Sequence, residues 1–319
     1  MPSSPLLVIA GPTAVGKTAI AVAAAGRLGA EIVSADSRTV YRGLDIGTAK
    51  PSRADRAAAP HHLLDVAAPD EVFTVADYQR LARAAIAEIR ARGRVPMLLG
   101  GTGLYLRAVV DGVAIPAVAP DWPRRARLEE EERAGGAGTL HRRLAEVDPE
   151  AAAAIHPRNL RRVIRALELY ERTGAPRAAP RGEGAESAPL MVALTLDRGR
   201  LYARIDRRLD QMIADGLVDE VRRLLDAGVA PALPAMQGLG YKELVPHIRG
   251  EIGLLEAVER LRRNTRRYAK RQWTWFRADP RYRWIDVDDD PPDVVAEKIS
   301  AMMALRRRHA ASDGAPGRL

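Results

Sequence analysis

Residues 5–18 read Pro-Leu-Leu-Val-Ile-Ala-Gly-Pro-Thr-Ala-Val-Gly-Lys-Thr, and this stretch decides the fold class. The apolar run at 5–10 is typical of a buried parallel strand, and a helix is expected from Lys17 to Leu28. Between them, the sequence matches the phosphate-loop pattern G-x-x-x-x-G-K-[ST]. Backbone amides of such a loop converge on phosphate oxygens, and the helix dipole favours the anion. The candidate phosphate-binding residues are Gly11, Pro12, Thr13, Ala14, Val15, Gly16, Lys17 and Thr18.

Within this loop, Lys17 is expected to meet an outer phosphate, and the Thr18 hydroxyl is expected to meet phosphate or Mg²⁺. The alternative is a chance glycine-rich turn. An ordinary P-loop ATPase also places an acidic residue at the end of a partner strand. Here the strand at 95–99 ends in Gly100-Gly101-Thr102, so the sequence indicates a ligand with a pyrophosphate more readily than an ordinary ATPase.

Strands and helices alternate along most of the chain, which predicts an α/β fold around a parallel sheet. Further strands are expected at 31–35, 95–99 and 190–196, and helices at 74–92, 104–110, 158–172, 200–226 and 251–277. Three prolines at 114–123 and a highly charged stretch at 124–147 indicate a helical insertion domain. We expect residues 1–113 to form the first part of the core, 114–157 the insertion, 158–311 the resumed core with basic helices, and 312–319 a disordered tail.

Charge and composition narrow the class of partner and compartment. The chain has 319 residues, no cysteine and a formal net charge of +9, which favours polyanions such as nucleic acid. A compositional bias of the source genome is the alternative, because only five of the 50 basic residues are lysine. No signal peptide or membrane-length apolar run is present, so we expect a cytoplasmic protein with no membrane contact.

Two polar residues follow buried strands and are candidates for chemistry. Ligands of doubly wound sheets lie beyond the carboxyl ends of the strands, so Asp36 should face the same cleft as the phosphate loop. Its carboxylate could accept a proton or bind Mg²⁺, and the alternative is a cap or turn aspartate. Thr102 could hydrogen-bond an acceptor or a leaving group, or it could cap the helix that begins at Leu104. His61 and His62 show no metal-ligand spacing and are expected to be loop or cap residues.

Several segments together resemble one family, the tRNA dimethylallyltransferases, also called tRNA isopentenyltransferases. They are the phosphate loop, Ser34–Ser37, Tyr41–Pro51, Gly100–Tyr105, Arg204–Arg208 with Met212, Gly238–Glu243 and Arg267–Arg277. The resemblance spans nearly all of residues 5–285 and is weakest at 114–150, at 175–190 and in the tail. Eukaryotic relatives often add a zinc finger, and the absence of cysteine makes this chain similar to the shorter bacterial form.

The resemblance implies a kinase-like P-loop core with a helical insertion domain. It also implies a reaction in which Mg²⁺, dimethylallyl pyrophosphate and a tRNA anticodon stem-loop take part. The acceptor would be the exocyclic amine of the adenosine 3′ of the anticodon (position 37). Asp36 is then the candidate base, Thr102 and Arg208 are further catalytic candidates, and Arg204 would bind pyrophosphate, although any arginine of the 204–208 segment could instead be a surface charge. A monomer is expected.

A basic, aromatic segment predicts an RNA surface. Residues 260–283 contain ten Arg or Lys and one acid, Asp279, with aromatic side chains between them. Guanidinium groups bind phosphates and flat rings stack unpaired bases, although Trp273, Phe276 and Trp284 could instead be core. Arg158–Arg165 forms a second basic stretch, which could also be a solvated helix face. The candidate tRNA-binding residues are Asp36, Ser37, Arg38, Thr39, Arg161, Arg162, Val163, Ile164, Arg165, Gln237, Gly238, Leu239, Gly240, Tyr241, Lys242, Lys270, Arg271, Gln272, Trp273, Thr274, Trp275, Phe276 and Arg277.

Two other functions remain open from the residues alone. A nucleotide or small-molecule kinase would share the phosphate loop, the parallel sheet and a helical lid. It would not explain the basic aromatic segment or the glycine-rich end of the strand at 95–99. A P-loop RNA-binding protein without chemistry would need no base at Asp36, and fold alone cannot separate these functions.

Overall fold

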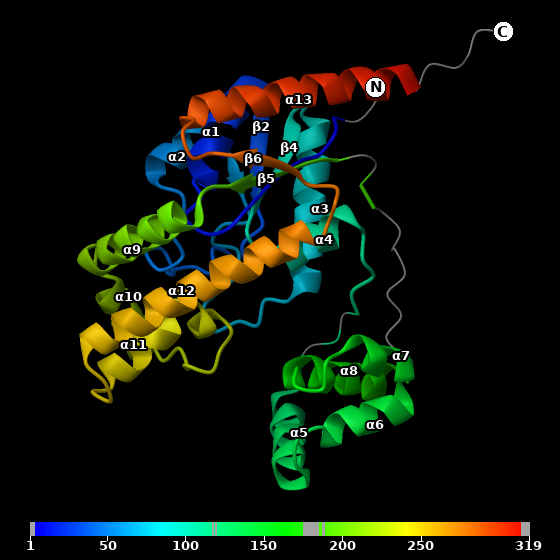
Figure 1. Ribbon diagram of the computed structural model, residues 1–319, viewed down its shortest axis with the longest axis vertical. Coiled ribbons are helices and arrows are strands. Elements are labelled where there is room, and N and C mark those ends of the chain that lie inside the picture. Colours follow the sequence, from blue (N-terminus) through cyan, green and yellow to red (C-terminus); the bar gives the residue numbers. More distant parts are fainter. Residues whose placement is uncertain (1–3, 117, 119, 175–184, 187–188, 314–319) are drawn as a thin grey trace, which may run out of the picture. The chain divides into compact units, whose positions relative to one another are not determined.

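The computed structural model describes residues 4–116, 118, 120–174, 185–186 and 189–313 (Figure 1). The chain divides into two compact units. Met1–Asp111 together with Ala185–Leu319 form the core unit, and Gly112–Gly184 form the insertion unit. This division corrects the expected boundary at residue 157, because the insertion extends well beyond it.

Six parallel strands form the sheet of the core unit in the order β3-β2-β4-β1-β5-β6. Their bounds are β1 Leu7–Ala10, β2 Ala30–Ser34, β3 His61–His62, β4 Val95–Gly100, β5 Leu190–Thr195 and β6 Arg283–Asp286. Strand β1 is central, since Leu7 pairs with Met97 on one side and with Leu190 on the other. All strands point the same way, so their carboxyl ends meet at one edge, which we call the carboxyl edge.

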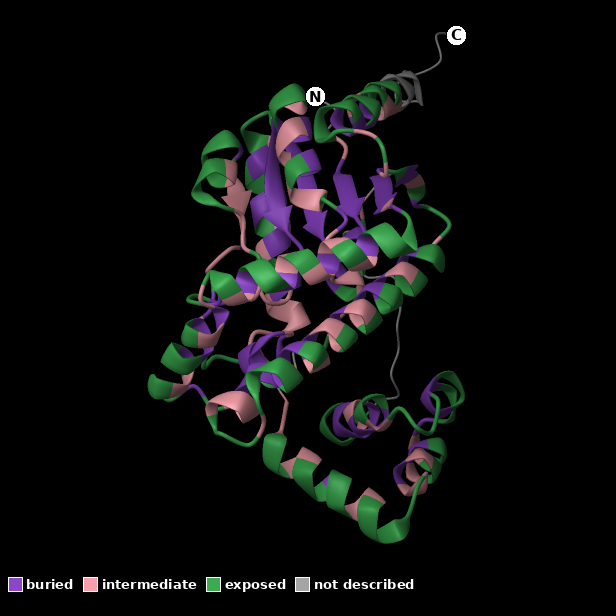
Figure 2. Cartoon of the chain, turned by 60° about the vertical axis from the view of Figure 1, so that its left-hand side comes forward, coloured by how far each residue is buried: buried purple, intermediate pink, exposed green. Residues whose placement is uncertain are grey.

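Alternating side chains of β1 supply both faces of the sheet. Leu7 and Ile9 pack with helices α1 (Lys17–Leu28) and α13 (Pro292–Asp313), whereas Val8 and Ala10 pack with α3 (Val75–Ala91) and α4 (Gly103–Val110). The strands are buried throughout their central part (Figure 2). The run at 5–10 is therefore apolar without alternation because it is covered on both sides.

Further helices lie at the carboxyl edge of the core unit. They are α9 (Arg198–Ala214), α10 (Leu217–Asp226), η1 (Ala235–Gln237), α11 (Tyr241–Ile248) and α12 (Leu254–Arg277), whereas α2 (Arg53–Ala58) packs beside α1. Helix α12 is about 36 Å long at 1.5 Å per residue. It crosses the sheet below the strand ends (Figure 1). Its buried positions recur every three or four residues, as expected for a helix that packs along one face.

In its described residues the insertion unit has four helices, α5 (Trp122–Gly135), α6 (Thr139–Val147), α7 (Pro149–Ala154) and α8 (Leu160–Thr173). Leu128, Leu144 and Leu167 belong to its separate apolar core. Helix α8, which we expected in the resumed core, packs instead on α5 and α6. Its apolar stripe determines this position, because a helix buries its apolar side against the nearest complementary surface.

The predicted strands and helices are confirmed to within a few residues, but several elements were not expected. The predicted helix at 200–226 is broken at Gly216, whose φ is 98°. His61 and His62 form strand β3 rather than a loop, and His62 Nε2 lies 2.7 Å from Glu31 Oε2. Helix α13 continues to Asp313, so part of the expected tail at 312–319 is helical and the remainder lies outside the described residues. None of the helices in the described part of the chain is long and apolar enough to cross a membrane.

Candidate active site

The phosphate loop connects β1 to α1 at the carboxyl edge. A Cβ at Gly11 would lie 2.8 Å from Leu194 O, so the loop can pass β5 only with glycine at this position. The ammonium group of Lys17 donates hydrogen bonds to Gly11 O at 3.0 Å and to Pro12 O at 2.8 Å. Burial lowers the pKa of Lys17 to about 7, the Arg208 charge acts in the same direction, and Asp36 opposes both. An anion bound here would therefore favour the charged form of Lys17.

Helix α9 directs two arginines at the loop. Arg208 donates to Thr13 Oγ1, and Arg204 Nη1 lies 3.5 Å from Val15 O. Residues four apart share one face of a helix, and the neighbouring Arg207 is exposed. Burial lowers the pKa of Arg208. The structure thus brings Arg204 and Arg208 to the phosphate loop, as the sequence led us to expect.

Gln272 ties the ends of two strands together. Its side-chain carbonyl accepts from Thr13 N at 2.8 Å, and its amide donates to Gly101 O at 3.0 Å. The Gln272 side chain is buried and bonded within the protein, and RNA binding at this position stays a prediction. Its role is to hold the phosphate loop against the end of β4.

Asp36 and Thr102 lie together where β2 and β4 end. Asp36 Oδ1 accepts from Arg38 N at 2.8 Å, and Thr102 Oγ1 accepts from Ser37 N at 3.1 Å. Thr102 precedes α4 without a side-chain cap bond, so its hydroxyl holds the Asp36 turn and does not cap the helix. Tyr268 of α12 completes the group. Burial and the Asp36 charge raise the pKa of Tyr268 to about 12, although a hydrogen bond with the Thr102 side chain opposes this.

Two cavities meet at these residues. The larger, of about 270 Å³, has walls from the Asp36 turn, α9, α11 and α12, and the smaller, of about 130 Å³, includes Lys17 and Thr18. The residues that line both cavities are Thr13, Asp36, Thr48, Ala49 and Arg208. One cavity therefore suits phosphate oxygens, and the other provides space for a second reactant that reaches the same Asp36.

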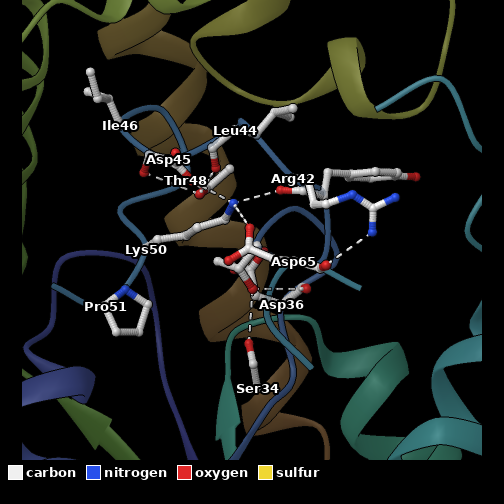
Figure 3. A network of polar contacts seen from close by, with 12 residues as sticks. Ser34, Asp36, Arg42, Leu44, Asp45, Ile46, Thr48, Lys50, Pro51 and Asp65 are labelled. Atoms are coloured by element: carbon white, nitrogen blue, oxygen red, sulfur yellow. Dashed lines mark hydrogen bonds and ion pairs between the residues drawn. The ribbon is translucent and has the colours of Figure 1, made fainter. Parts of the chain in front are cut away.

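The walls of both cavities include a segment that we call the strap, residues 41–51 (Figure 3). The Lys50 ammonium donates to Tyr41 O and Asp45 Oδ1, both at 2.6 Å, and also pairs with Asp65. The Lys50 side chain is only 3% exposed. This network closes the base of the strap, which presents Thr48 and Ala49 to the cavities.

Glu220 of α10 holds the strap from the other side. Its carboxylate accepts from Asp45 N at 3.0 Å, Ile46 N at 2.8 Å and Gly47 N at 3.1 Å. It also accepts from Tyr241 Oη at 2.6 Å, and burial followed by the Glu220 charge raises the pKa of Tyr241. Sequence reasoning missed Glu220, although a charged residue on the apolar side of α10 was a usable signal.

The structure separates the candidate RNA residues into three groups. Those lining the larger cavity are Asp36, Ser37, Arg38, Gln237, Gly238, Leu239, Gly240, Tyr241, Lys242 and Arg271. Outside this cavity, the exposed candidates are Arg161, Arg162, Lys270, Thr274, Trp275 and Arg277. Trp273 and Arg165 are partly buried. Those with buried side chains are Thr39, Val163, Ile164 and Phe276, besides Gln272 and Tyr241. The side chains of Val163, Ile164 and Phe276 pack into the cores of the two units, so RNA binding at these positions stays a prediction that only the backbone could fulfil.

The end of β4 excludes the acidic residue of an ordinary P-loop ATPase. A Cβ at Gly100 would lie 2.1 Å from Ala35 O, so no side chain fits there. Among the described residues, no group of three or more His, Cys, Asp or Glu could hold a metal ion. Thr18 and Asp36 both line the smaller cavity, so a Mg²⁺ ion there could meet one hydroxyl, one carboxylate, ligand phosphate oxygens and water, which suits this ion.

Together, the fold and the site define a P-loop α/β protein with a helical insertion, built around a phosphate loop and an adjoining cavity. The family model described as IPP transferase matches residues 39–279, and the chain belongs to this family. It is 54% identical over 287 residues to the tRNA dimethylallyltransferase of Symbiobacterium thermophilum, with 89% of each chain covered.

Solved structures agree with this assignment. The tRNA isopentenylpyrophosphate transferase of Bacillus halodurans is similar with a TM-score of 0.73 and 44% identity, over 97% of this chain and 98% of that chain. The tRNA delta(2)-isopentenylpyrophosphate transferase of Staphylococcus epidermidis has a TM-score of 0.69 and 34% identity, over 94% and 99%. The expected fold class, family and transferase activity are confirmed, and the kinase alternative finds no support.

Proposed function

We propose that the protein transfers a dimethylallyl group from dimethylallyl pyrophosphate to a tRNA, at the exocyclic amine of the adenosine 3′ of the anticodon. One observation carries the proposal. Asp36 faces both the cavity of the phosphate loop and the larger cavity beside it. A carboxylate in this position can serve an acceptor held on one side while the leaving group is held on the other. The names of the relatives support the same two substrates.

The phosphate loop and α9 are assigned to the pyrophosphate. Lys17, Arg204 and Arg208 bring three positive charges to the loop, and their positions suit oxygens of the leaving group. The Thr18 hydroxyl would hold Mg²⁺, which supplies additional positive charge to the pyrophosphate when bound. Neutralising this group makes it a better leaving group, because negative charge grows on it as the bond to carbon breaks.

The transfer itself exchanges one bond for another. The allylic carbon–oxygen bond breaks, its electron pair leaves with the pyrophosphate, and the adenine nitrogen forms the new bond to carbon. The nitrogen then loses a proton, and Asp36 is the assigned acceptor. A positioned base of this kind typically contributes about 10²–10⁴-fold to the rate. Thr102 holds the turn that presents Asp36 and is assigned a positioning role.

Recognition of the tRNA is assigned to α12, to the wall of the larger cavity and to the arginines of α8. An adenosine stacked in an anticodon loop must leave the stack to reach an enclosed site. The exposed Trp275 offers a flat surface for an unpaired base, and Lys270, Arg271 and Arg277 offer charge to the backbone. Arg161 and Arg162 are exposed on the insertion unit. The proposal also carries the expectation of a cytoplasmic monomer.

A labelling experiment tests the reaction directly. The protein is incubated with total tRNA and labelled dimethylallyl pyrophosphate, and the RNA is digested and its nucleosides are separated. A labelled, prenylated adenosine 3′ of the anticodon is expected. Absence of label in RNA would refute the proposal, and phosphate transfer from ATP under the same conditions would favour the kinase.

A substitution of Asp36 tests the mechanism. Asp36→Asn preserves shape and hydrogen bonding but removes basicity, so both substrates should bind nearly as in the wild type while kcat falls. Single-turnover rates at saturating substrates separate chemistry from binding. A wild-type single-turnover rate would exclude Asp36 as the base. Loss of pyrophosphate or Mg²⁺ affinity alone would make Asp36 a ligand-holding residue instead.

A further inference from the structure

A second basic groove lies between α9 and α12, apart from the two cavities. Its lining residues are Arg198, Tyr202, Glu259, Arg262, Arg263, Arg266, Arg267 and Lys270. None of these residues lines either cavity of the candidate active site. Six of the eight side chains are basic and one is acidic, so the groove needs a separate explanation.

Only part of this charge is neutralised within the protein. Arg262 pairs with Asp210 and Glu259, and Arg266 pairs with Asp206. Within the described part of the chain, the other four cations of the groove form no ion pair with a carboxylate. They are Arg198, Arg263, Arg267 and Lys270, and all four are exposed. Like charges held this close repel one another, so an added anion would be favoured.

The geometry of the groove is partly fixed before any ligand arrives. The Arg198 and Arg266 guanidiniums lie 5.3 Å and 5.5 Å from the centroid of the Tyr202 ring, and Arg198 Nε donates to Tyr202 Oη at 3.2 Å. Arg263, Arg267 and Lys270 recur at intervals of four and three on α12, so they share one side of the helix. From Arg263 to Lys270 this row extends about 10 Å along the axis. Such a row suits consecutive phosphates better than one small anion.

The row also adjoins the exposed end of α12. Lys270 both lines the groove and begins the segment Lys270–Arg277, which carries the basic and aromatic side chains assigned above to RNA. A backbone that lies across that segment can therefore continue along the groove without a break in positive charge. Contacts of this kind position a nucleic acid but read no sequence.

We propose that this groove binds the phosphate backbone of the substrate RNA outside the anticodon stem-loop. This inference rests on the proposed tRNA substrate. The groove supplies affinity and orientation for the whole tRNA, and the cavities supply the chemistry. It contributes to the capture of the substrate and leaves the rate of the bound complex unchanged.

The test uses the double variant Arg263→Ala/Arg267→Ala, which removes two exposed charges from the groove. The matched control is Arg27→Ala/Arg94→Ala, which removes the same charge from exposed positions where α1 ends and β4 begins, at the opposite edge of the sheet. Dissociation constants for unmodified tRNA and for a short anticodon stem-loop RNA are measured over a series of salt concentrations. Thermal unfolding of each variant verifies that its fold is intact.

The groove variant should bind tRNA more weakly, and the salt slope of its binding should fall by about 1.5, as expected for two lost phosphate contacts. The anticodon stem-loop and inorganic pyrophosphate should lose far less affinity, and the control should behave as the wild type. In turnover assays, KM for tRNA should rise while kcat stays unchanged. A wild-type salt slope, or an equal effect in the control, would overturn the proposal.

Other results would overturn it in different ways. Weakened pyrophosphate binding with normal tRNA binding would assign the groove to the small substrate. An equal loss for the stem-loop and the full tRNA would place the contact within the anticodon stem-loop. The binding constants for RNA are measured without the transfer reaction. A negative labelling experiment would therefore refute the proposed function, whereas unchanged tRNA binding by the groove variant would refute only the role of the groove.

Discussion

Replacement of Glu220 should loosen the wall between the two cavities. This carboxylate is 2% exposed and has four hydrogen-bond donors around it. Oε2 accepts from Asp45 N and Ile46 N, and Oε1 accepts from Gly47 N and Tyr241 Oη. The next residues of the strap, Thr48 and Ala49, line both cavities. Glu220 is therefore a positioning residue for the site although it does not line either cavity.

The expected cost follows from which bonds each substitution removes. Glu220→Ala leaves three amides and a hydroxyl without their acceptor, at about 1–3 kcal/mol for each group that stays buried. The strap can partly open to water, so we expect a total of about 3–5 kcal/mol, typical of removing one partner of a buried charged network. Glu220→Gln keeps one acceptor oxygen, but its NH₂ must face two donors whichever way it turns. It should cost about 2–3 kcal/mol.

Tyr241→Phe removes one donor and leaves the three amide bonds intact. It should cost about 1 kcal/mol, the ordinary net value of one hydrogen bond. Glu220→Ala should therefore destabilise the protein most, Glu220→Gln less, and Tyr241→Phe least. Urea unfolding gives these free energies, and hydrogen exchange of the amides of Asp45, Ile46 and Gly47 reports the strap itself.

A positioning role has a kinetic signature that general destabilisation lacks. Glu220→Gln should exchange the strap amides faster and raise KM for both substrates, at a temperature where the variant is fully folded. Protection of these amides equal to that of the wild type would refute the reasoning, as would a Gln variant that unfolds at the same urea concentration as the wild type.

Three further predictions follow. Lys17→Ala should weaken pyrophosphate binding on the order of tenfold or more by calorimetry, because it removes a charge-assisted contact; unchanged affinity would show that Lys17 does not meet the phosphate. Burial alone would raise the pKa of Glu168, but hydrogen bonds from Arg125 and Arg165 hold it at about 2. The ionised Glu168 should therefore stabilise the fold above its unfolded pKa near 4.5, and this stabilisation should be lost as pH falls towards 2. Urea unfolding between pH 4.5 and 2 should show this loss in the wild type and not in Glu168→Gln. A Cβ at Gly103 would lie 2.1 Å from Trp275 Nε1, so Gly103→Ala should displace this ring and raise KM for tRNA more than KM for dimethylallyl pyrophosphate. Equal changes in the two constants would mean that Trp275 does not serve the RNA.

Local patterns predicted the centre of the fold well. The expected helix at Lys17–Leu28 has the same bounds in the structure, because loop and helix are specified by adjacent residues. Strands β3 and β6 were missed for the opposite reason. β3 has two residues and β6 reads Arg-Trp-Ile-Asp, so neither shows a long apolar run, and both form because a neighbouring strand offers hydrogen bonds. Propensity yields to tertiary context in such short elements.

The candidate site likewise contains residues that the sequence could predict and residues that it could not. Asp36 and Thr102 could be found because the rule for strand ends places them without knowledge of the remaining structure. Glu220 and Gln272 could not be found in this way, because their hydrogen-bond partners are distant in sequence. The backbone partners of Glu220 lie 173 to 175 positions away, and those of Gln272 lie 171 and 259 positions away. Apart from the Tyr241 hydroxyl, their partners are backbone groups, which carry no sequence signal. Residues that hold a site together are therefore harder to predict than residues that face its ligand.

Helix α12 links the two proposed substrates through one rigid element. Tyr268 and Gln272 lie one turn apart on its inner side, where they meet Thr102, Thr13 and Gly101. Lys270, Arg271 and Trp275 lie on exposed positions of the same turns. A helix resists bending over so short a distance, so a force on the exposed side acts on the phosphate loop and the Asp36 turn together. RNA seated on α12 would thus contact the same element that supports both halves of the reacting site, and substitutions on the inner side of this helix, at Tyr268 or Gln272, should affect both substrates.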